Sequence, residues 1–293
     1  AIGARRNDGN GNSSGHTRIY SWNGTAWNQL GNDIDGEAAD DESGYSVSLS
    51  ANGTTVAIGA RRNDGNGNSS GHTRIYSWNG TAWNQLGSDI DGEAANDFSG
   101  ISISLSNDGN TVAIGAHKND GNGSKSGHAR IYNWDGTTWS QLGNDIDGEA
   151  SDDESGFSVS LAGNGTVVAV SAHQNDGNGT NAGHTRIYTW NGTTWNQLGN
   201  DIDGEAANDE SGYSVAISND GNTVAIGARL NDGNGTNSGQ TRIYNWNGTT
   251  WSQLGSDIDG EASDDESGFS VSLSDDGTTV AIGARQNDGN GTN

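Results

Sequence analysis

The chain has 293 residues, with 48 Gly, 10 Trp and no Pro, Cys or Met, and its 13 basic and 38 acidic residues give a net charge of −25 at pH 7. The absence of Cys excludes disulfides and thiolate chemistry. The acidic balance argues against a nucleic-acid binder, which needs a basic face, and no apolar run is long enough for membrane insertion.

A repeat of 56 residues organises the whole sequence. The tetrapeptide Ala-Ile-Gly-Ala at residues 1–4 recurs at Ala57, Ala113, Ala225 and Ala281, and the variant Ala-Val-Ser-Ala begins at Ala169. Five full repeats therefore cover 1–56, 57–112, 113–168, 169–224 and 225–280, and residues 281–293 begin a sixth. A fixed period of this size is typical of propellers, solenoids and arrays.

Taken in chain order, each repeat predicts four short strands. Alternating or β-branched apolar residues mark the strands, and turns with Gly separate them. In one copy the expected strands are residues 45–50, 55–60, 73–78 and 81–86, with a long Asn- and Gly-rich loop at 63–71. Asn79-Gly80 is a strong signal for a tight hairpin turn, which needs positive φ at both central residues. No apolar pattern of period 3.6 occurs, so we expect essentially no helix.

Four antiparallel strands in a repeat of this length predict a blade. The expected fold is all-β, with tandem four-stranded blades of 56 residues in a β-propeller-like arrangement, as a closed ring or an open stacked array. A single blade cannot bury both of its faces, so neighbouring blades must stack. The Trp pairs of the outer strands are interpreted as packing between blades, with sugar stacking as the alternative.

Three segments of the repeat resemble the FG-GAP repeat, the blade type of integrin α-subunit propellers. They are Ser43–Ser50, Val56–Ala60 and Gly71–Tyr76. The resemblance implies a propeller fold, an extracellular or cell-surface location and calcium loops in some blades. Two features depart from the family. The Pro of its Gly-Ala-Pro motif is replaced by Arg5, Arg61, His117, His173, Arg229 and Arg285, and the long loop has a single carboxylate, such as Asp64, instead of Asp-x-Asp-x-Asp-Gly.

N-glycosylation sequons recur in the long loop of every repeat. The first two repeats carry the sequon at one position, and the other four carry it two residues earlier. An exposed loop of a secreted protein is the context that N-glycosylation needs. We therefore expect N-linked glycans at Asn12, Asn68, Asn122, Asn178, Asn234 and Asn290.

The acidic run after the fourth strand is a candidate cation site. In the first repeat its residues are Asp33, Asp35, Glu37 and Asp41. Hard cations prefer several oxygen ligands, so weak Ca²⁺ binding is a hypothesis here, and a solvated loop between blades is the alternative. The equivalent residues are Asp89, Asp91, Glu93 and Asp97; Asp145, Asp147, Glu149 and Asp153; Asp201, Asp203, Glu205 and Asp209; and Asp257, Asp259, Glu261 and Asp265.

A histidine follows the long loop in four repeats, at His16, His72, His128 and His184, and Gln240 takes its place in the fifth. Gln cannot shuttle protons and is a poor metal ligand, so a structural hydrogen-bonding role is favoured. Near-identical blades would present several copies of one residue set, and no catalytic motif stands out. The sequence therefore predicts that the protein is not an enzyme.

Two functions fit these observations. The first is an extracellular structural repeat protein, N-glycosylated and assembled into a filament or surface layer by self-association or by further repeats of the same chain. A head-to-tail contact that does not close builds filaments. The alternative is a closed propeller that binds a ligand or partner, as an adhesion module of a larger cell-surface protein.

Overall fold

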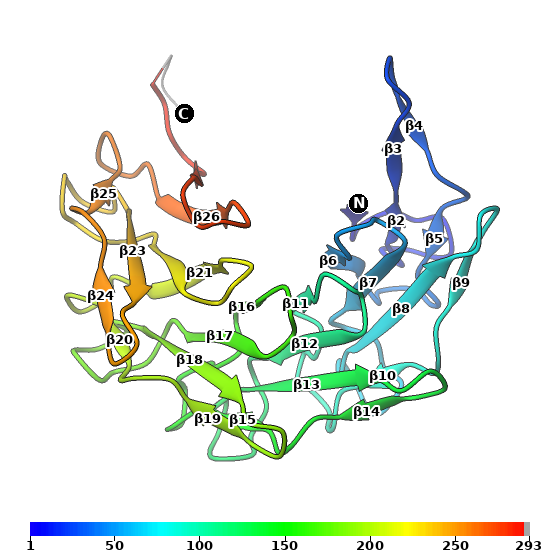
Figure 1. Ribbon diagram of the computed structural model, residues 1–293, viewed down its shortest axis with the longest axis horizontal. Coiled ribbons are helices and arrows are strands. Elements are labelled where there is room, and N and C mark those ends of the chain that lie inside the picture. The colour runs from blue at the N-terminus through cyan, green and yellow to red at the C-terminus, as the bar shows by residue number, and fades with distance from the viewer. Residues whose placement is uncertain (290–293) are drawn as a thin grey trace.

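The computed structural model describes residues 1–289, and within them every regular element is a β-strand. Blades lie side by side in an arc that stays open, with the N-terminus and the C-terminal segment on opposite sides of the opening (Figure 1). The expectation of an all-β, propeller-like array without helix is confirmed, in its open form. Among the described residues no helix exists that could cross a membrane.

Four complete blades form the centre of the arc, and each is an antiparallel sheet of five strands. The first contains β6 (Ser43–Leu49), β7 (Thr55–Ala60), β8 (His72–Trp78), β9 (Trp83–Gln85) and β10 (Ile90–Asp91). The second contains β11 (Ser102–Leu105), β12 (Thr111–Ala116), β13 (His128–Trp134), β14 (Trp139–Gln141) and β15 (Ile146–Asp147). The third contains β16 (Val159–Leu161), β17 (Val167–Ala172), β18 (His184–Trp190), β19 (Trp195–Gln197) and β20 (Ile202–Asp203). The fourth contains β21 (Ser211–Ile217), β22 (Thr223–Ala228), β23 (Gln240–Trp246), β24 (Trp251–Gln253) and β25 (Ile258–Asp259).

An incomplete blade lies at each end of the arc. The N-terminal one has β1 (Ile2–Ala4), β2 (His16–Arg18), β3 (Tyr20–Trp22), β4 (Trp27–Gln29) and β5 (Ile34–Asp35), and the C-terminal one has β26 (Ser267–Leu273) and β27 (Val280–Ala284). The N-terminal blade therefore lacks a first strand, and the C-terminal blade supplies a first and a second strand. Each complete blade takes its first strand from one 56-residue repeat and its last three strands from the next, and its second strand crosses the boundary between them.

The fifth strand of each blade was not expected from the sequence. In the first blade, Ile90 pairs with Thr73 and Asp91 pairs with His72, so β10 adds to the third strand, β8, beyond the end of β9. This pairing fixes the start of the acidic run beside the histidine that begins β8. The sequence-based interpretation had placed the whole acidic run in a loop.

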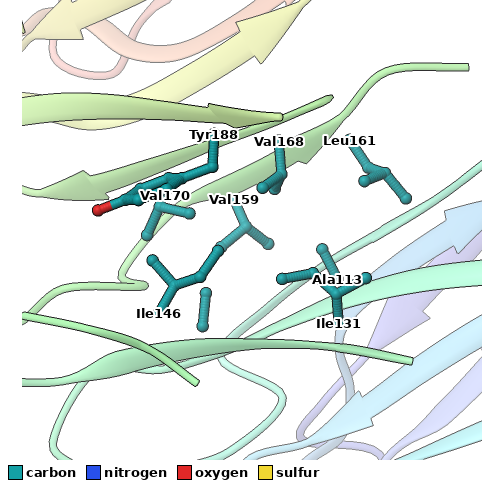
Figure 2. Packing of buried hydrophobic residues seen from close by; sticks show 9 residues of the cluster. Ala113, Ile131, Ile146, Val159, Leu161, Val168, Val170 and Tyr188 are labelled. Atoms are coloured by element: carbon teal, nitrogen blue, oxygen red, sulfur yellow. The ribbon is translucent and has the colours of Figure 1, made fainter. Parts of the chain in front are cut away.

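Each hydrophobic cluster lies between two blades, not within one. In Figure 2, Ile131 and Ile146 of the second blade face Val159, Val168 and Tyr188 of the third. Equivalent clusters join the N-terminal blade to the first complete blade, the first to the second, and the third to the fourth. Burial of apolar area is the main favourable term in folding, so these interfaces hold the array together.

Glycine is required where the inner strands of neighbouring blades converge. A Cβ on Gly59 or Gly115 would collide with the carbonyl oxygen of Gly100 or Gly156 in the next blade. The third blade has Ser171 at this position. Its hydroxyl bonds to the backbone N–H and carbonyl of Ser158 at 3.0 and 3.1 Å, and β16 starts only at Val159. In this blade the first strand, β16, is shorter than β6 and β21.

Candidate functional site

The contact between neighbouring blades is repeated four times and contains the residues that sequence analysis singled out. Its outer part is a hydrogen bond from a tryptophan to the preceding blade. Trp139 Nε1 donates to the Leu86 carbonyl at 2.8 Å. The equivalent pairs are Trp83 with Leu30, Trp195 with Leu142, and Trp251 with Leu198, at 2.7–2.9 Å. The second Trp of these four pairs thus packs between blades, as predicted.

A buried arginine forms the middle of the same interface. Arg130 donates from Nη2 to the Asp91 carbonyl of the preceding blade at 2.7 Å, and its Nη1 lies 3.5 Å from Glu93 Oε1. Only 6% of Arg130 is exposed. Because a buried charge is tolerated only with a partner, the glutamate of one blade and the arginine of the next are linked. Arg74, Arg186 and Arg242 repeat the arrangement.

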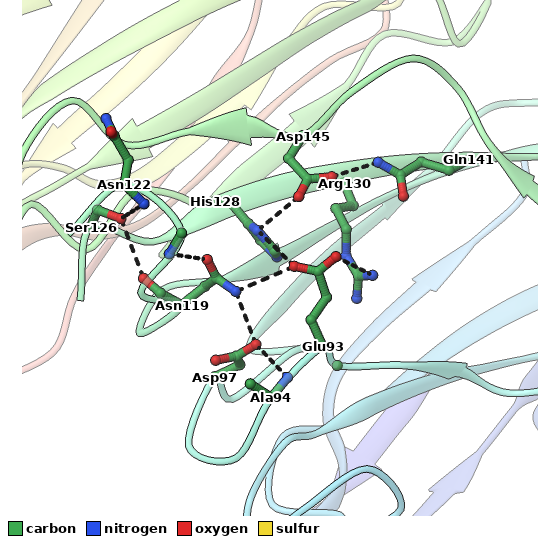
Figure 3. Close-up of polar contacts among 12 residues, drawn as sticks. Glu93, Ala94, Asp97, Asn119, Asn122, Ser126, His128, Arg130, Gln141 and Asp145 are labelled. Atoms are coloured by element: carbon green, nitrogen blue, oxygen red, sulfur yellow. Dashed lines mark hydrogen bonds and ion pairs between the residues drawn. The ribbon is translucent and has the colours of Figure 1, made fainter. Parts of the chain in front are cut away.

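A histidine and two carboxylates meet beside this arginine (Figure 3). His128 Nδ1 lies 3.8 Å from Glu93 Oε2 and 3.6 Å from Asp145 Oδ2. Glu93 follows the fifth strand of one blade, whereas His128 and Asp145 belong to the next. The same triad recurs as Glu37, His72 and Asp89 and as Glu149, His184 and Asp201, with one ligand atom of each residue within 4.8 Å of the others.

Burial keeps these histidines neutral. It is the main cause that lowers the pKa of His72, His128 and His184 to about 4, and the neighbouring arginine lowers it further. Burial also raises the pKa of Glu93. At neutral pH each imidazole therefore retains a lone pair on one ring nitrogen. That form of histidine is a metal ligand.

The structure separates the four carboxylates of the first acidic run. Asp33 and Asp35 lie with His16, and Glu37 reaches the triad of the next blade. Asp41 is buried, and its Oδ2 accepts hydrogen bonds from the Ala38 amide at 3.0 Å and the Asn63 side chain at 3.2 Å. Asp97, Asp153, Asp209 and Asp265 accept equivalent bonds. The fourth carboxylate of each run therefore shapes a turn.

The long loop does not fit the calcium loop that the family resemblance implies. It offers the single carboxylate Asp64, whose Oδ1 accepts the Ser69 amide at 2.7 Å. Ca²⁺ needs six or more oxygen ligands. The acidic and histidine residues of the triads come from other segments. Sequence reasoning missed them as a set, although the spacing of 35 residues from Glu37 to His72 recurs from Glu93 to His128 and from Glu149 to His184.

The sequon asparagines that the structure describes are exposed residues of the long loops, and they have two different hydrogen-bonding environments. Asn122 donates from Nδ2 to the carbonyls of Gly148 and Glu149, at 2.8 and 3.2 Å. Asn178 and Asn234 repeat these bonds, and so do Asn10 and Asn66, which are not in sequons. Asn12 and Asn68 lie two residues further along the loop, and Asn12 bonds only the exposed carboxylate of Asp40 at 3.2 Å. Asn290 lies outside the described residues.

The residues that replace the family proline line the inner rim of the arc and stack on aromatic rings. His173 lies 4.0 Å from Phe157, measured between ring centroids, and Arg61 and Arg229 lie over Tyr45 and Tyr213. Burial is the main cause that lowers the pKa of His117 and His173 to about 3. At this position every repeat therefore has an arginine or a histidine whose planar side chain packs against an aromatic ring.

The two ends of the arc expose the two halves of the blade interface. At the N-terminal end, Ile2 is 61% exposed and Trp27 is 66% exposed, and with Tyr20 they line an open apolar pocket. At the C-terminal end, Leu254 and Ile258 are exposed. The interior equivalents of Ile2 and Ile258, such as Ile114 and Ile146, are buried. The exposed set is therefore the set that a neighbouring blade covers elsewhere.

Comparison with known proteins identifies the repeat and the fold. The family model of the FG-GAP repeat matches residues 34–76, 89–132 and 202–244. No curated protein matches the sequence. The periplasmic gluconolactonase PpgL of Pseudomonas aeruginosa is similar in structure, with a TM-score of 0.59 and 13% identity over 90% of this chain and 70% of that one. A putative 6-phosphogluconolactonase from Bacteroides uniformis has a TM-score of 0.50 and 11% identity over 91% and 87%.

These structural neighbours correct one expectation. The sequence predicted that the protein is not an enzyme because its blades are nearly identical and carry no catalytic motif. Both neighbours bear the names of lactonases, so the exclusion was wrong. A fold does not determine a function, and repetition of the blades is no argument against catalysis on this scaffold.

The repeat matches agree with the resemblance found in the sequence. Each matched segment crosses the boundary between two 56-residue repeats, and the first includes the strands from which the resemblance was drawn. FG-GAP repeats are typical of extracellular and cell-surface proteins. The chain is a β-propeller-like array in which three segments match the FG-GAP repeat.

Proposed function

We propose that this chain belongs to an extracellular, N-glycosylated structural protein whose blade array is extended at its ends, by further repeats of the same chain or by end-to-end contact between copies, giving a filament or a surface layer. The observation that carries the proposal is the complementarity of the two ends. Each end exposes the half-interface that pairs with the opposite half at every contact inside the array. A heterologous contact of this kind extends without limit when its rotation does not close a ring.

The expected contacts at such a joint follow from the 56-residue period. Trp27 is the equivalent of Trp83, and Leu254 is the equivalent of Leu30, to which Trp83 donates. Trp27 of one copy would therefore donate to the Leu254 carbonyl of the next. By the same shift, Arg18 would leave its own Asp33, 2.9 Å away, for the partner's Glu261.

Two strands, β27 of one copy and β1 of the next, could each form the second strand of the blade at this joint. The C-terminal β26 supplies the first strand that the N-terminal blade lacks, while β27 and β1 carry nearly the same sequence and are alternative second strands. Formation of the joint requires that one of them leaves its place. Pairing at an otherwise open sheet edge supplies new backbone hydrogen bonds in return.

The charge of the chain sets the conditions for assembly. Because each copy has a net charge of −25, copies repel each other at low salt. At 0.1 M salt the Debye length is about 10 Å, so repulsion over longer distances is largely screened. We therefore expect association to strengthen between low and physiological ionic strength. N-linked glycans on the long loops would lie beside the joint, because those loops are exposed along the array.

Sedimentation velocity over a range of concentrations tests the proposal. The wild-type chain should form a ladder of oligomers, while Trp27→Ala and Leu254→Asp should each remain monomeric. Both side chains are exposed, so both variants should keep the wild-type fold. A mixture of the two variants should form dimers and nothing larger, since one intact end of each kind remains.

A wild-type chain that stays monomeric at all concentrations and salt conditions would refute the proposal. So would a mixture of the two variants that fails to dimerise, because a head-to-tail contact requires this complementation. The circular dichroism and thermal unfolding of each variant serve as folding controls.

A further inference from the structure

We propose that the blade interfaces bind divalent transition-metal ions of the zinc type, one in each triad of glutamate, histidine and aspartate. The three sites are Glu37, His72 and Asp89; Glu93, His128 and Asp145; and Glu149, His184 and Asp201. In each, the glutamate comes from one blade and the other two ligands from the next. The ion would thus cross-link neighbouring blades. This inference does not rest on end-to-end assembly, and its count of three ions refers to the monomer, because a joint would bring Glu261 of one copy to His16 and Asp33 of the next.

The histidine points to a ligand. His128 is 1% exposed, and neither of its ring nitrogens has a hydrogen-bond partner. Leaving a buried polar group without a partner is costly. Its Nδ1 instead faces one oxygen of Glu93 and one of Asp145, which lie on either side of it in Figure 3.

The spacing of these atoms suits a metal ion. Zinc binds nitrogen and oxygen ligands at about 2.0–2.2 Å, so ligand atoms of a tetrahedral site lie about 3.4 Å apart. His128 Nδ1 is 3.6 Å from Asp145 Oδ2 and 3.8 Å from Glu93 Oε2. These two distances exceed that spacing by about 0.2 and 0.4 Å, and the three ligand atoms all lie within 4.8 Å of one another. Imidazole together with carboxylate is a ligand set typical of zinc, nickel and copper rather than calcium.

Each carboxylate is held by its other oxygen. Gln141 Nε2 donates to Asp145 Oδ1 at 2.6 Å, and Arg130 Nη1 lies beside Glu93 Oε1 at 3.5 Å. Asn119 makes a further long contact, 3.5 Å, with Glu93 Oε2. In the other two triads the same oxygens are held by Gln85 and Arg74 and by Gln197 and Arg186. Outer partners that orient the ligands are a regular part of metal sites.

The fourth interface provides a natural contrast. There Gln240 replaces the histidine, and its Nε2 donates to Glu205 Oε2 at 3.2 Å. The amide nitrogen carries no lone pair for a metal, and it occupies the carboxylate oxygen that would be a ligand. The rest of the site is present, since Gln253 holds Asp257 at 2.6 Å and Arg242 lies beside Glu205.

The N-terminal blade is a second contrast. His16 lies with Asp33 and Asp35, but no preceding blade supplies a glutamate. Arg18 contacts both oxygens of Asp33 at 2.9–3.0 Å. We therefore expect three ions per chain, not four or five.

The test is a zinc titration of chelator-stripped full-length protein, followed by competition with a chromophoric chelator and by calorimetry. The wild type should bind three Zn²⁺ per chain. His72→Gln, His128→Gln and His184→Gln should each bind one fewer, and Gln240→His should bind one more. The removed histidine is replaced by the residue that the fourth interface already contains, so these variants should fold.

The absorption of Co²⁺-loaded protein gives a second readout. The bands of a low-symmetry site with nitrogen and oxygen ligands should lose a third of their intensity in each His→Gln variant. Asp145→Asn, which keeps the shape of the side chain, should also remove one site. No zinc binding, or binding whose stoichiometry is the same in the wild type and in all of these variants, would overturn the proposal.

Discussion

The same isoleucine at two places in the array gives a direct test of where stability resides. Ile114 in β12 and Ile2 in β1 occupy equivalent positions in the repeat. Ile114 is 1% exposed and packs with Ile75 and Ile90 of the preceding blade, whereas Ile2 is 61% exposed. The substitutions Ile114→Ala and Ile2→Ala therefore remove the same atoms from a covered and an uncovered interface.

The expected difference follows from the burial. Truncation of Ile114 removes three buried carbons at about 0.8 kcal/mol each, and the cavity left behind brings the cost for such a truncation to about 2–5 kcal/mol. A substitution at an exposed position such as Ile2 costs less than about 0.5 kcal/mol. The free energy of unfolding of the first and second complete blades should thus fall only in Ile114→Ala.

Urea denaturation and hydrogen exchange measure this difference. Tryptophan fluorescence reports the transition, because every blade except the C-terminal one carries a Trp pair, and peptide-resolved exchange shows which blades loosen. Local resolution matters because repeat arrays need not unfold in one step. If Ile114→Ala and Ile2→Ala have equal costs, then the contacts between blades do not stabilise the array, and the reasoning fails.

Three further predictions concern the interface, the inner rim and the loops. Trp139→Phe should cost about 1 kcal/mol through loss of the hydrogen bond to Leu86, while Trp27→Phe should be neutral in monomers; equal urea midpoints for the two variants would contradict this. The folded-state pKa values of His117 and His173 are lowered to about 3. Between about pH 6.5 and pH 3 these histidines therefore bind protons in the unfolded chain but not in the folded one, and the free energy of unfolding should fall as the pH falls through that range. The double His→Gln variant should lose less stability than the wild type between pH 7.5 and pH 5 in urea titrations, and parallel losses would argue against these histidines. In a glycosylating secretory host, mass spectrometry should find higher occupancy at Asn68 than at Asn122, whose Nδ2 already donates to two carbonyls; full occupancy of Asn122 would show that those bonds do not protect it.

The blade architecture could be predicted from the sequence because its signals are local. Alternation along Tyr45–Ser50 and the turn at Asn79-Gly80 define strands and a hairpin without any knowledge of their surroundings, and the structure places β6 and the β8–β9 hairpin there. The short strand Ile90–Asp91 has two residues, too few for any periodicity. Its existence depends on the exposed edge of β8, which the sequence alone does not show.

The triads could not be assembled from the sequence for a similar reason. Glu93 and His128 are 35 residues apart and meet only because successive blades stack. The sequence-based interpretation treated the histidine as structural because Gln240 replaces it once. The structure suggests another reason for that substitution, since Gln240 forms a direct hydrogen bond with Glu205, whereas neither ring nitrogen of His128 has a hydrogen-bond partner.

The role of the sequon asparagines also depends on structural contacts that the sequence does not show. The shift between Asn68 and Asn122 suggested that a sequon is retained in every loop. The structure shows that asparagine at the earlier position donates the same two bonds in five loops, including those of Asn10 and Asn66, which carry no sequon there. That asparagine has a structural role whether or not it is glycosylated.

Electron cryomicroscopy of the concentrated chain at physiological salt tests the central claim most directly. The account predicts filaments in which every joint reproduces the interior interface, with Trp27 Nε1 of one copy bonded to the Leu254 carbonyl of the next. Closed discs, isolated arcs or joints made through any other surface would contradict it.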